Sequence, residues 1–293
     1  MNNSYKGFLM ALGAYLIWGL APLFYKLLNQ VSPTQIVLHR LVWCFFFSVI
    51  FSFILFGRNF IKKLNNIKSF SIFVLSGILI CSHWFLFNHA VSNNLVIEAS
   101  LGYFLTPLIS CFLGWLFLKE KPDYFRQIAI LLGLIAVFWL VLKLNKIPWL
   151  SLLIALSFGF YGFVKKKTTT DSLTALVIES GFLLPFFLIY WIWLGYHHQS
   201  AMNFHDMKTF ILLIIAGFLT ASPLFLYASA FKHLSLTAVG FMLYLTPTIQ
   251  FLCAVFILKE PLDVSKFIGF AITWVALIVF SIGALQKKKH PNS

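Results

Sequence analysis

The sequence predicts an all-α polytopic membrane protein with ten transmembrane helices arranged as two inverted five-helix repeats. Composition is the first observation behind this prediction: 60% of the 293 residues are hydrophobic and only 10% are charged, whereas soluble domains carry about a quarter charged residues. A soluble fold of this length could not bury so much apolar surface, so the lipid bilayer is the expected solvent. The second observation is a stretch of sequence that occurs twice at a fixed spacing.

The apolar residues form ten runs, each close to the ~20 residues that a helix needs to cross the hydrocarbon core. The first run follows a lysine and is longer than the core of a signal peptide, so we expect a retained helix. The runs are apolar on all sides, unlike barrel strands, and the short connections between them leave no room for a soluble domain. In order, the predicted helices cover residues 7–28, 35–56, 69–92, 96–118, 124–142, 147–164, 172–195, 207–231, 236–258 and 264–285.

The stretch LTPLISCFLGWLFLKEKPD at 105–123 recurs as LTPTIQFLCAVFILKEPLD at 245–263, an offset of 245 − 105 = 140 residues. The same offset aligns further glycines, aromatic pairs and a threonine without a gap. We therefore expect a duplication into residues 1–144 and 145–293, each with five helices. Because five is odd, the second copy enters the membrane from the opposite side. Inverted repeats of this kind typically place a substrate site near the midplane, between the halves.

The net charge of +14 is spread over short clusters between apolar runs, as in membrane topology signals, rather than gathered on a surface suited to nucleic acid. If both termini are cytoplasmic, fifteen Lys and Arg residues fall on the cytoplasmic side and six on the other. This bias predicts cytoplasmic termini. The four cysteines lie inside apolar runs without the spacing of metal ligands, so we expect small packing residues.

Three ionisable residues lie inside predicted helices, where a charge is costly: Arg40, Glu98 and Glu179. The predicted topology puts Arg40 and Glu98 toward the same membrane face, so they are either part of a substrate site or a structural ion pair. In the functional interpretation, Arg40 orients an anionic or polar group of the solute, and Glu98 or Glu179 takes a proton or cation. In the structural interpretation, hydroxyl groups cap Glu179. At the repeat offset, Glu179 corresponds to His39, so the two copies differ where their charges lie.

Aromatic and histidine side chains supply the other candidates. Trp84 and Asn88 are four residues apart and share a helix face. Together with the aromatic residues of the first helix they form either core packing or the wall of a cavity for a flat or cationic solute. His39 could exchange protons near neutral pH, whereas His83 is interpreted as a packing residue. The predicted substrate-binding residues are Tyr15, Trp18, His39, Arg40, Trp84, Asn88, Glu98, Tyr103, Glu179 and Tyr244.

Both copies of the repeated stretch contain a proline inside the helix and end in Lys-Glu. Pro107 and Pro247 would bend or loosen their helices, because the freed backbone groups must find other partners. The pairs at 119–120 and 259–260 are interpreted as salt-bridged anchors at the membrane interface.

Several segments carry a resemblance to a known family: AYLIWGLAP (14–22), HRLVW (39–43), IEASLGYFLTPL (97–108), FYGFVKK (160–166), IESGFLLP (178–185) and YLTPT (244–248). Over nearly its whole length the chain resembles the EamA family of the drug/metabolite transporter superfamily, and within it the bacterial RarD group. The resemblance implies two EamA repeats and an inner-membrane transporter. Three features depart from it. Lys-Glu often stands as Gly-Glu in the family, and His83 stands where RarD relatives commonly have asparagine. The first helix also lacks the glutamate of small multidrug relatives, so their proton exchange is not implied.

We therefore expect a secondary-active permease or exporter of small metabolites or drugs that works by alternating access, with chloramphenicol-like compounds among the candidates. The expected partners are a small-molecule solute, the bilayer and protons, in a monomer or a homodimer. No cofactor, metal or nucleic acid is expected, and the sequence has no P-loop for ATP hydrolysis. The alternatives are a facilitative uptake carrier, a lipid scramblase and a membrane enzyme. An enzyme would need a convergent acidic or nucleophilic site, which the eight acidic residues do not form within any one predicted helix.

Overall fold

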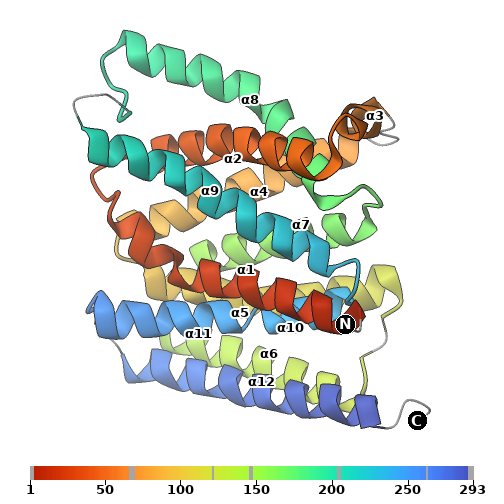
Figure 1. Ribbon diagram of the computed structural model, residues 1–293. Coiled ribbons are helices and arrows are strands. Elements are labelled where there is room, and N and C mark those ends of the chain that lie inside the picture. Colours follow the sequence, from red (N-terminus) through yellow and green to blue (C-terminus); the bar gives the residue numbers. More distant parts are fainter. Residues whose placement is uncertain are drawn as a thin grey trace.

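The computed structural model describes residues 3–65, 70–120, 122–144, 148–202, 206–261 and 263–289. Long helices lie roughly along one direction, horizontal in Figure 1, and no strand occurs in the described ranges. The elements are α1 (Asn3–Lys26), α2 (Pro33–Phe56), α3 (Asn59–Asn65), α4 (Phe70–Ser92), α5 (Val96–Leu118), α6 (Tyr124–Leu144), α7 (Trp149–Lys167), α8 (Ser172–Tyr196), α9 (Met207–Ala230), α10 (Leu236–Met242), α11 (Leu245–Leu252), the π-helical segment η1 (Cys253–Ile257) and α12 (Val264–Lys289).

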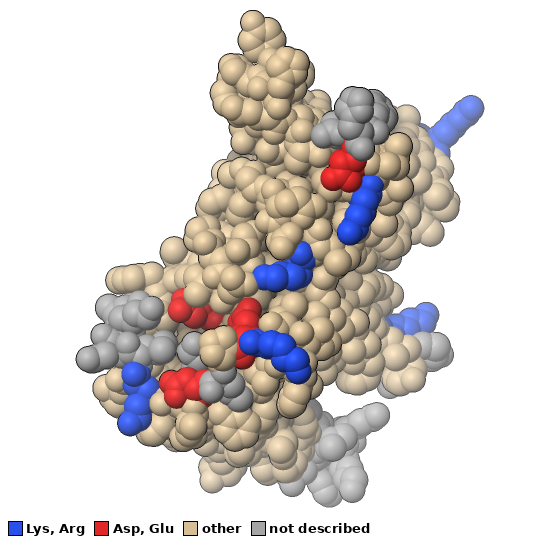
Figure 2. All heavy atoms as spheres, turned by 90° about the vertical axis from the view of Figure 1, so that its left-hand side faces the viewer, with Lys and Arg blue, Asp and Glu red and all other residues tan. Residues whose placement is uncertain are grey.

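Nine candidate membrane spans occur among the described residues, and a shorter apolar stretch of α12, Phe267–Gly283, supplies a tenth. The predicted fold class is therefore confirmed. We call the side where α1 begins, α12 ends and α3 lies the α3 end, and the opposite side the far end (right and left in Figure 1). Figure 2 looks onto the far end, where most of the visible surface is uncharged. Several predicted features lie outside the described residues: the helix ends at 69 and 147, and three lysines of the charge count, Lys68, Lys121 and Lys146.

The ninth predicted span differs from its expected form, because 236–258 is divided into α10, α11 and η1. The chain turns at Leu243 and Tyr244, just before Pro247. A proline inside a helix lacks a donor and its ring clashes with the carbonyl four residues earlier, which here belongs to Leu243. The equivalent Pro107 is accommodated inside the continuous α5. The short helix α3 was not predicted either.

The two halves interlock, since α4 packs against α7 and α8, and its counterpart α9 packs against α1 and α2. Glycines allow the closest approaches. A Cβ on Gly77 of α4 would lie 2.9 Å from the carbonyl oxygen of Glu179, and one on Gly217 of α9 would overlap Trp43. Gly77 and Gly217 are 140 residues apart. The repeat seen in the sequence therefore extends to the way the halves pack.

The two Lys-Glu pairs terminate their helices with the same backbone geometry. Lys119 and Lys259 both have a φ of 57°, the left-handed conformation that most often holds glycine after a helix. The N–H of the following glutamate then donates to a carbonyl six residues earlier, that of Gly114 or Ala254, at 3.0 Å in both copies. The left-handed residue thus lets the chain fold back onto the carbonyls of the last helical turns. Its positive φ explains physically why glycine suits the lysine position.

The glutamate side chains of these pairs reach across to the other half. Glu120 Oε1 accepts a hydrogen bond from the backbone N–H of Leu236 at 3.1 Å, and Glu260 Oε2 accepts one from Ile97 at 3.3 Å. Each carboxylate thus lies at the N-terminus of α10 or α5, where free N–H groups and the helix dipole favour a negative charge. The interpretation as interfacial anchors did not foresee this reciprocal capping between the repeats.

Candidate functional site

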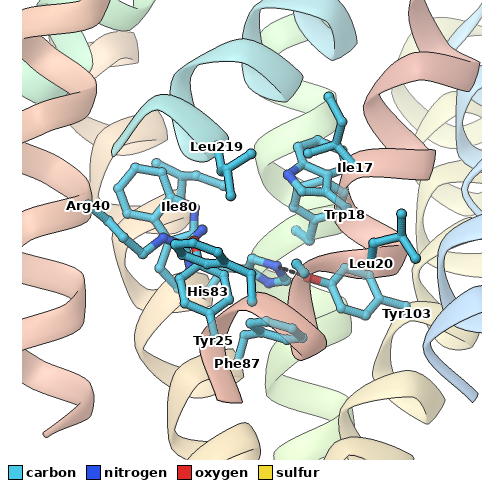
Figure 3. Close-up of a pocket in the computed structure, with 14 residues that line it drawn as sticks. Ile17, Trp18, Leu20, Tyr25, Arg40, Ile80, His83, Phe87, Tyr103 and Leu219 are labelled. Carbon is cyan, nitrogen blue, oxygen red and sulfur yellow. Dashed lines mark hydrogen bonds between the residues drawn. The ribbon is translucent and has the colours of Figure 1, made fainter. Parts of the chain in front are cut away.

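A cavity of about 210 Å³ lies between α1, α2, α4 and α5 of the first half and α7 and α9 of the second. Its walls are mainly aromatic and aliphatic, with one arginine and one histidine (Figure 3). The lining residues that the following paragraphs use are Trp18, Tyr25, Arg40, His83, Trp84, Tyr103 and Phe158. The cavity therefore lies between inverted repeats, which is where transporters built this way bind substrate.

Arg40 is carried into the cavity by α2, which starts at the Ser32 cap and at Pro33, a residue suited to the first helical turn. Its side chain is buried, with 4% of the residue exposed. Nε donates a hydrogen bond to Thr220 Oγ1 of α9 at 3.0 Å, while the buried Nη1 has no hydrogen-bond partner among the described residues. The cation therefore bridges the two halves and keeps one donor nitrogen available.

The rings of Tyr25 and Trp84 hold the guanidinium group, whose Cζ lies 4.7 Å and 4.9 Å from the two ring centroids. All eight acidic residues fall in the described part of the chain. The ion pairs among the described residues do not include Arg40. Cation–π contacts contribute up to ~2 kcal/mol when desolvated, whereas an unpaired buried charge costs ~3–5 kcal/mol. The charge of Arg40 is therefore only partly compensated by the protein.

His83 of α4 is the second polar group of the cavity, although it was interpreted from the sequence as a packing residue. Its Nε2 lies 2.8 Å from the Tyr103 hydroxyl, drawn as a dashed line in Figure 3, and its Nδ1 lies 3.4 Å from Ser157 Oγ. The imidazole stacks on Phe158 with ring centroids 4.7 Å apart. One signal could have pointed to it: the copy has Pro223 at the equivalent position, so His83 is a difference between the repeats.

An aromatic layer separates the cavity from the α3 end of the bundle. It consists of Tyr15, Trp18, Phe158, Tyr161 and Tyr227, whose neighbouring ring centroids lie 5.2–6.3 Å apart. Tyr15 is fully buried and its hydroxyl donates to the carbonyl oxygen of Val239 at 2.6 Å. Such edge-on and stacked pairs pack tightly and exclude water. The layer therefore fills the space between the cavity and the α3 end.

A buried ion pair lies behind this layer, toward the α3 end. Lys165 Nζ is 2.9 Å from Glu179 Oε1, and both side chains are 3% exposed. The Ser76 hydroxyl donates to Oε1 at 2.6 Å, and the Tyr161 hydroxyl donates to Oε2 at 3.5 Å. Hydroxyl capping of Glu179 was one of the two sequence interpretations, but the pairing with Lys165 was not predicted. Lys165 had been counted among the charges on the cytoplasmic side.

Of the predicted substrate-binding residues, the structure brings Trp18, Arg40, Trp84 and Tyr103 together in the cavity wall. Glu98 lies elsewhere, in a small pocket at the far end with Asn94 and Glu260. The predicted alternative of an Arg40–Glu98 pair is therefore not formed in this structure. Phe158 and Thr220 were missed, although Phe158 is the repeat counterpart of Trp18. Tyr25 belongs to the aromatic residues of the first helix considered for a cavity wall, but it was not among the predicted binding residues.

The remaining predicted residues pack around the cavity rather than lining it. His39 is fully buried and lies edge-on to Trp191 of α8, with ring centroids 4.9 Å apart. Successive helical residues point about 100° apart, so the side chain of His39 leaves α2 in a different direction from that of Arg40. Asn88 donates to the carbonyl oxygen of Trp84 at 2.8 Å, and Tyr244 is fully buried.

Comparison with known proteins places this geometry in a family. The EamA-like transporter family matches the chain twice, over residues 5–142 and 145–282. Protein RarD of Escherichia coli (strain K12) is 37% identical over 289 residues, which cover 98% of this chain and 97% of that protein. A transporter of Pseudomonas aeruginosa described as uncharacterized is 36% identical over 289 residues, covering 98% and 97%.

A solved structure described only as the crystal structure of a protein shares the fold, with a TM-score of 0.68, 12% identity and coverage of 94% and 96%. The doubled match, the full-length relatives and the apolar helices agree with one another. The chain is a multi-pass membrane protein that belongs to the EamA-like transporter family.

Proposed function

We propose that this protein is a secondary transporter that carries a small metabolite or drug by alternating access, with the solute held in the cavity between the two halves. The observation that carries the proposal is Arg40, a buried cation with an unused donor, at the interface between inverted repeats. The membrane is the bacterial inner membrane and both termini face the cytoplasm. The charge bias of the sequence supports this orientation.

The conformation fits one state of such a cycle. The aromatic layer lies between the cavity and the α3 end, which is the cytoplasmic side in the proposed orientation. Rocking of one half against the other would open the layer toward the α3 end. Gly77 and Gly217 allow close contact between helices of different halves, at the surfaces that would slide.

Glu179 is the proposed site of coupling to protons. Its carboxylate is buried between α4, α7 and α8, where an ionisable group is costly and thus a functional candidate. Protonation would neutralise the carboxylate and break its ion pair with Lys165, directly behind the layer that must open. Glu98 is the weaker candidate, because its pocket lies at the far end and apart from the cavity.

Solute flux into proteoliposomes with an imposed pH gradient tests the proposal. Candidate solutes, chloramphenicol among them because of the family resemblance, should cross faster than through protein-free liposomes, and the gradient should drive their accumulation. Flux that ignores the gradient would remove proton coupling and leave facilitated diffusion. If no candidate crosses faster than through empty liposomes while fluorescent lipids do change leaflet, the protein is a scramblase rather than a solute transporter.

A further inference from the structure

The charge of the cavity decides which solutes it can hold. Arg40 is buried and has no acidic partner in the described chain, which includes all eight acidic residues. A buried charge without a counterion is strongly unfavourable. Nη1 also lacks a hydrogen-bond partner, so the guanidinium group offers both charge and a donor to a ligand. An anion is the ligand that satisfies both.

A cationic solute, which an aromatic cavity would otherwise suit, is disfavoured here. Cations bind over the faces of aromatic rings, but the guanidinium group of Arg40 already lies over Tyr25 and Trp84. None of the cavity-lining residues is acidic. A positively charged group would therefore meet Arg40 without a counterion. The same absence of a carboxylate leaves the ammonium group of a zwitterion without a partner.

The size and lining of the cavity indicate the rest of the solute. An engineered apolar cavity of about 150 Å³ binds benzene, so the volume of about 210 Å³ admits one ring with a small substituent. Phe24, Phe87 and Phe158 supply flat apolar walls. The hydrogen-bonded pair of His83 and Tyr103 lies across the cavity from Arg40 in Figure 3 and offers a second polar contact.

We propose that the cavity binds a small planar organic monoanion of the aromatic carboxylate class, with the carboxylate on Arg40 and the ring between the aromatic walls. The proposal rests on the proposed function in taking this ligand as the transported solute. Binding itself can be measured without transport, so the two can fail separately.

Four probes of similar shape test the charge selectivity of the wild-type protein in detergent: benzoate, neutral benzamide, cationic benzylammonium and zwitterionic phenylalanine. Titration calorimetry, with quenching of tryptophan fluorescence as a second readout, measures their affinities. Benzoate should bind about 10- to 100-fold more tightly than benzamide, the range of a charge-assisted hydrogen bond. Benzylammonium and phenylalanine should bind more weakly than benzamide. If benzamide or benzylammonium binds as tightly as benzoate, or more tightly, the proposal is overturned.

The variant Arg40→Gln localises the effect and has a matched control in Arg58→Gln, the same change at an exposed arginine. Arg40→Gln should lower benzoate affinity about 10- to 100-fold and leave benzamide affinity unchanged, whereas Arg58→Gln should change neither. Unchanged benzoate affinity in Arg40→Gln would remove the assigned site. The wild-type comparison of probes stays decisive if Arg40→Gln does not fold.

The outcomes also separate the two proposals. Benzoate binding without flux of any solute would keep the anion site and remove the transport function. Flux of another solute with no benzoate binding would keep transport and remove the assigned substrate class.

Discussion

Replacing Lys165 with methionine removes the basic half of an ion pair that is buried in the membrane-spanning bundle. The two charged atoms are 2.9 Å apart and both side chains are 3% exposed. Removing one partner leaves an uncompensated carboxylate, with a cost of about 3–5 kcal/mol in the free energy of unfolding. Ser76 and Tyr161 donate to Glu179 in either case, so their hydrogen bonds do not replace the lost charge. Glu179→Gln should lower the free energy of unfolding by a similar amount, because it leaves the ammonium group of Lys165 without its carboxylate partner.

Thermal unfolding of the purified protein measures the effect. At about 2–4 °C per kcal/mol, each single variant should lower the Tm by roughly 6–20 °C. The double variant Lys165→Met/Glu179→Gln carries neither charge and should recover most of that loss, since replacing both members of a buried pair is often nearly neutral. Its Tm should therefore lie above that of either single variant.

The chain provides a matched control in a second Lys–carboxylate pair. Lys63 Nζ lies 3.0 Å from Asp171 Oδ2, but these side chains are 38% and 17% exposed. Lys63→Met should cost less than about 1 kcal/mol, because water screens the pair. If Lys165→Met lowers the Tm no more than Lys63→Met, or the double variant is as unstable as the sum of the single variants, the reasoning about burial is wrong.

Three further predictions concern backbone geometry and pH. Gly217→Ala should lower the Tm, because the added methyl overlaps the backbone of α2, whereas Gly195→Ala, with open space around it, should be neutral or slightly stabilising. Lys119→Gly should raise the free energy of unfolding by up to ~1 kcal/mol in chemical denaturation, since glycine relieves the left-handed φ of 57°. Burial raises the pKa of Asp171, but hydrogen bonds from Thr174 and Lys63 outweigh it and hold the pKa below its ordinary value. Its stabilisation should therefore be present above pH ~4 and lost as the pH falls through the lowered pKa, and Asp171→Asn should remove this part of the pH dependence of the Tm.

The spans and the repeat could be predicted because both leave one-dimensional signals in the sequence. Hydrophobic runs mark the helices, and a constant offset marks the duplication. The break in the ninth span could not be predicted in the same way, since Pro107 and Pro247 occupy equivalent positions and only one interrupts its helix. The presence of a proline at this position therefore does not decide whether the helix is interrupted.

The site was predicted only in part, because its contacts join residues far apart in the chain. Arg40 was singled out by its charge, but its bond to Thr220 spans 180 residues. Lys165 was hidden in a basic cluster that topology rules treat as a surface signal, although its side chain turns into the bundle. Residue type identified these side chains, and only the packing of the two halves showed their partners.

Trp18 and Phe158 are 140 residues apart, so they are the same position in the two repeats, and their rings meet edge-on with centroids 5.3 Å apart. Equivalent residues that touch must straddle the pseudo-twofold axis. If the halves exchange conformations, each ring takes the place of the other. The place of Tyr25 is then taken by its repeat counterpart Lys165, and the place of Arg40 by its counterpart Ser180. A solute resting on this ring pair would keep the same platform on both sides of the membrane, while the polar groups facing it would change.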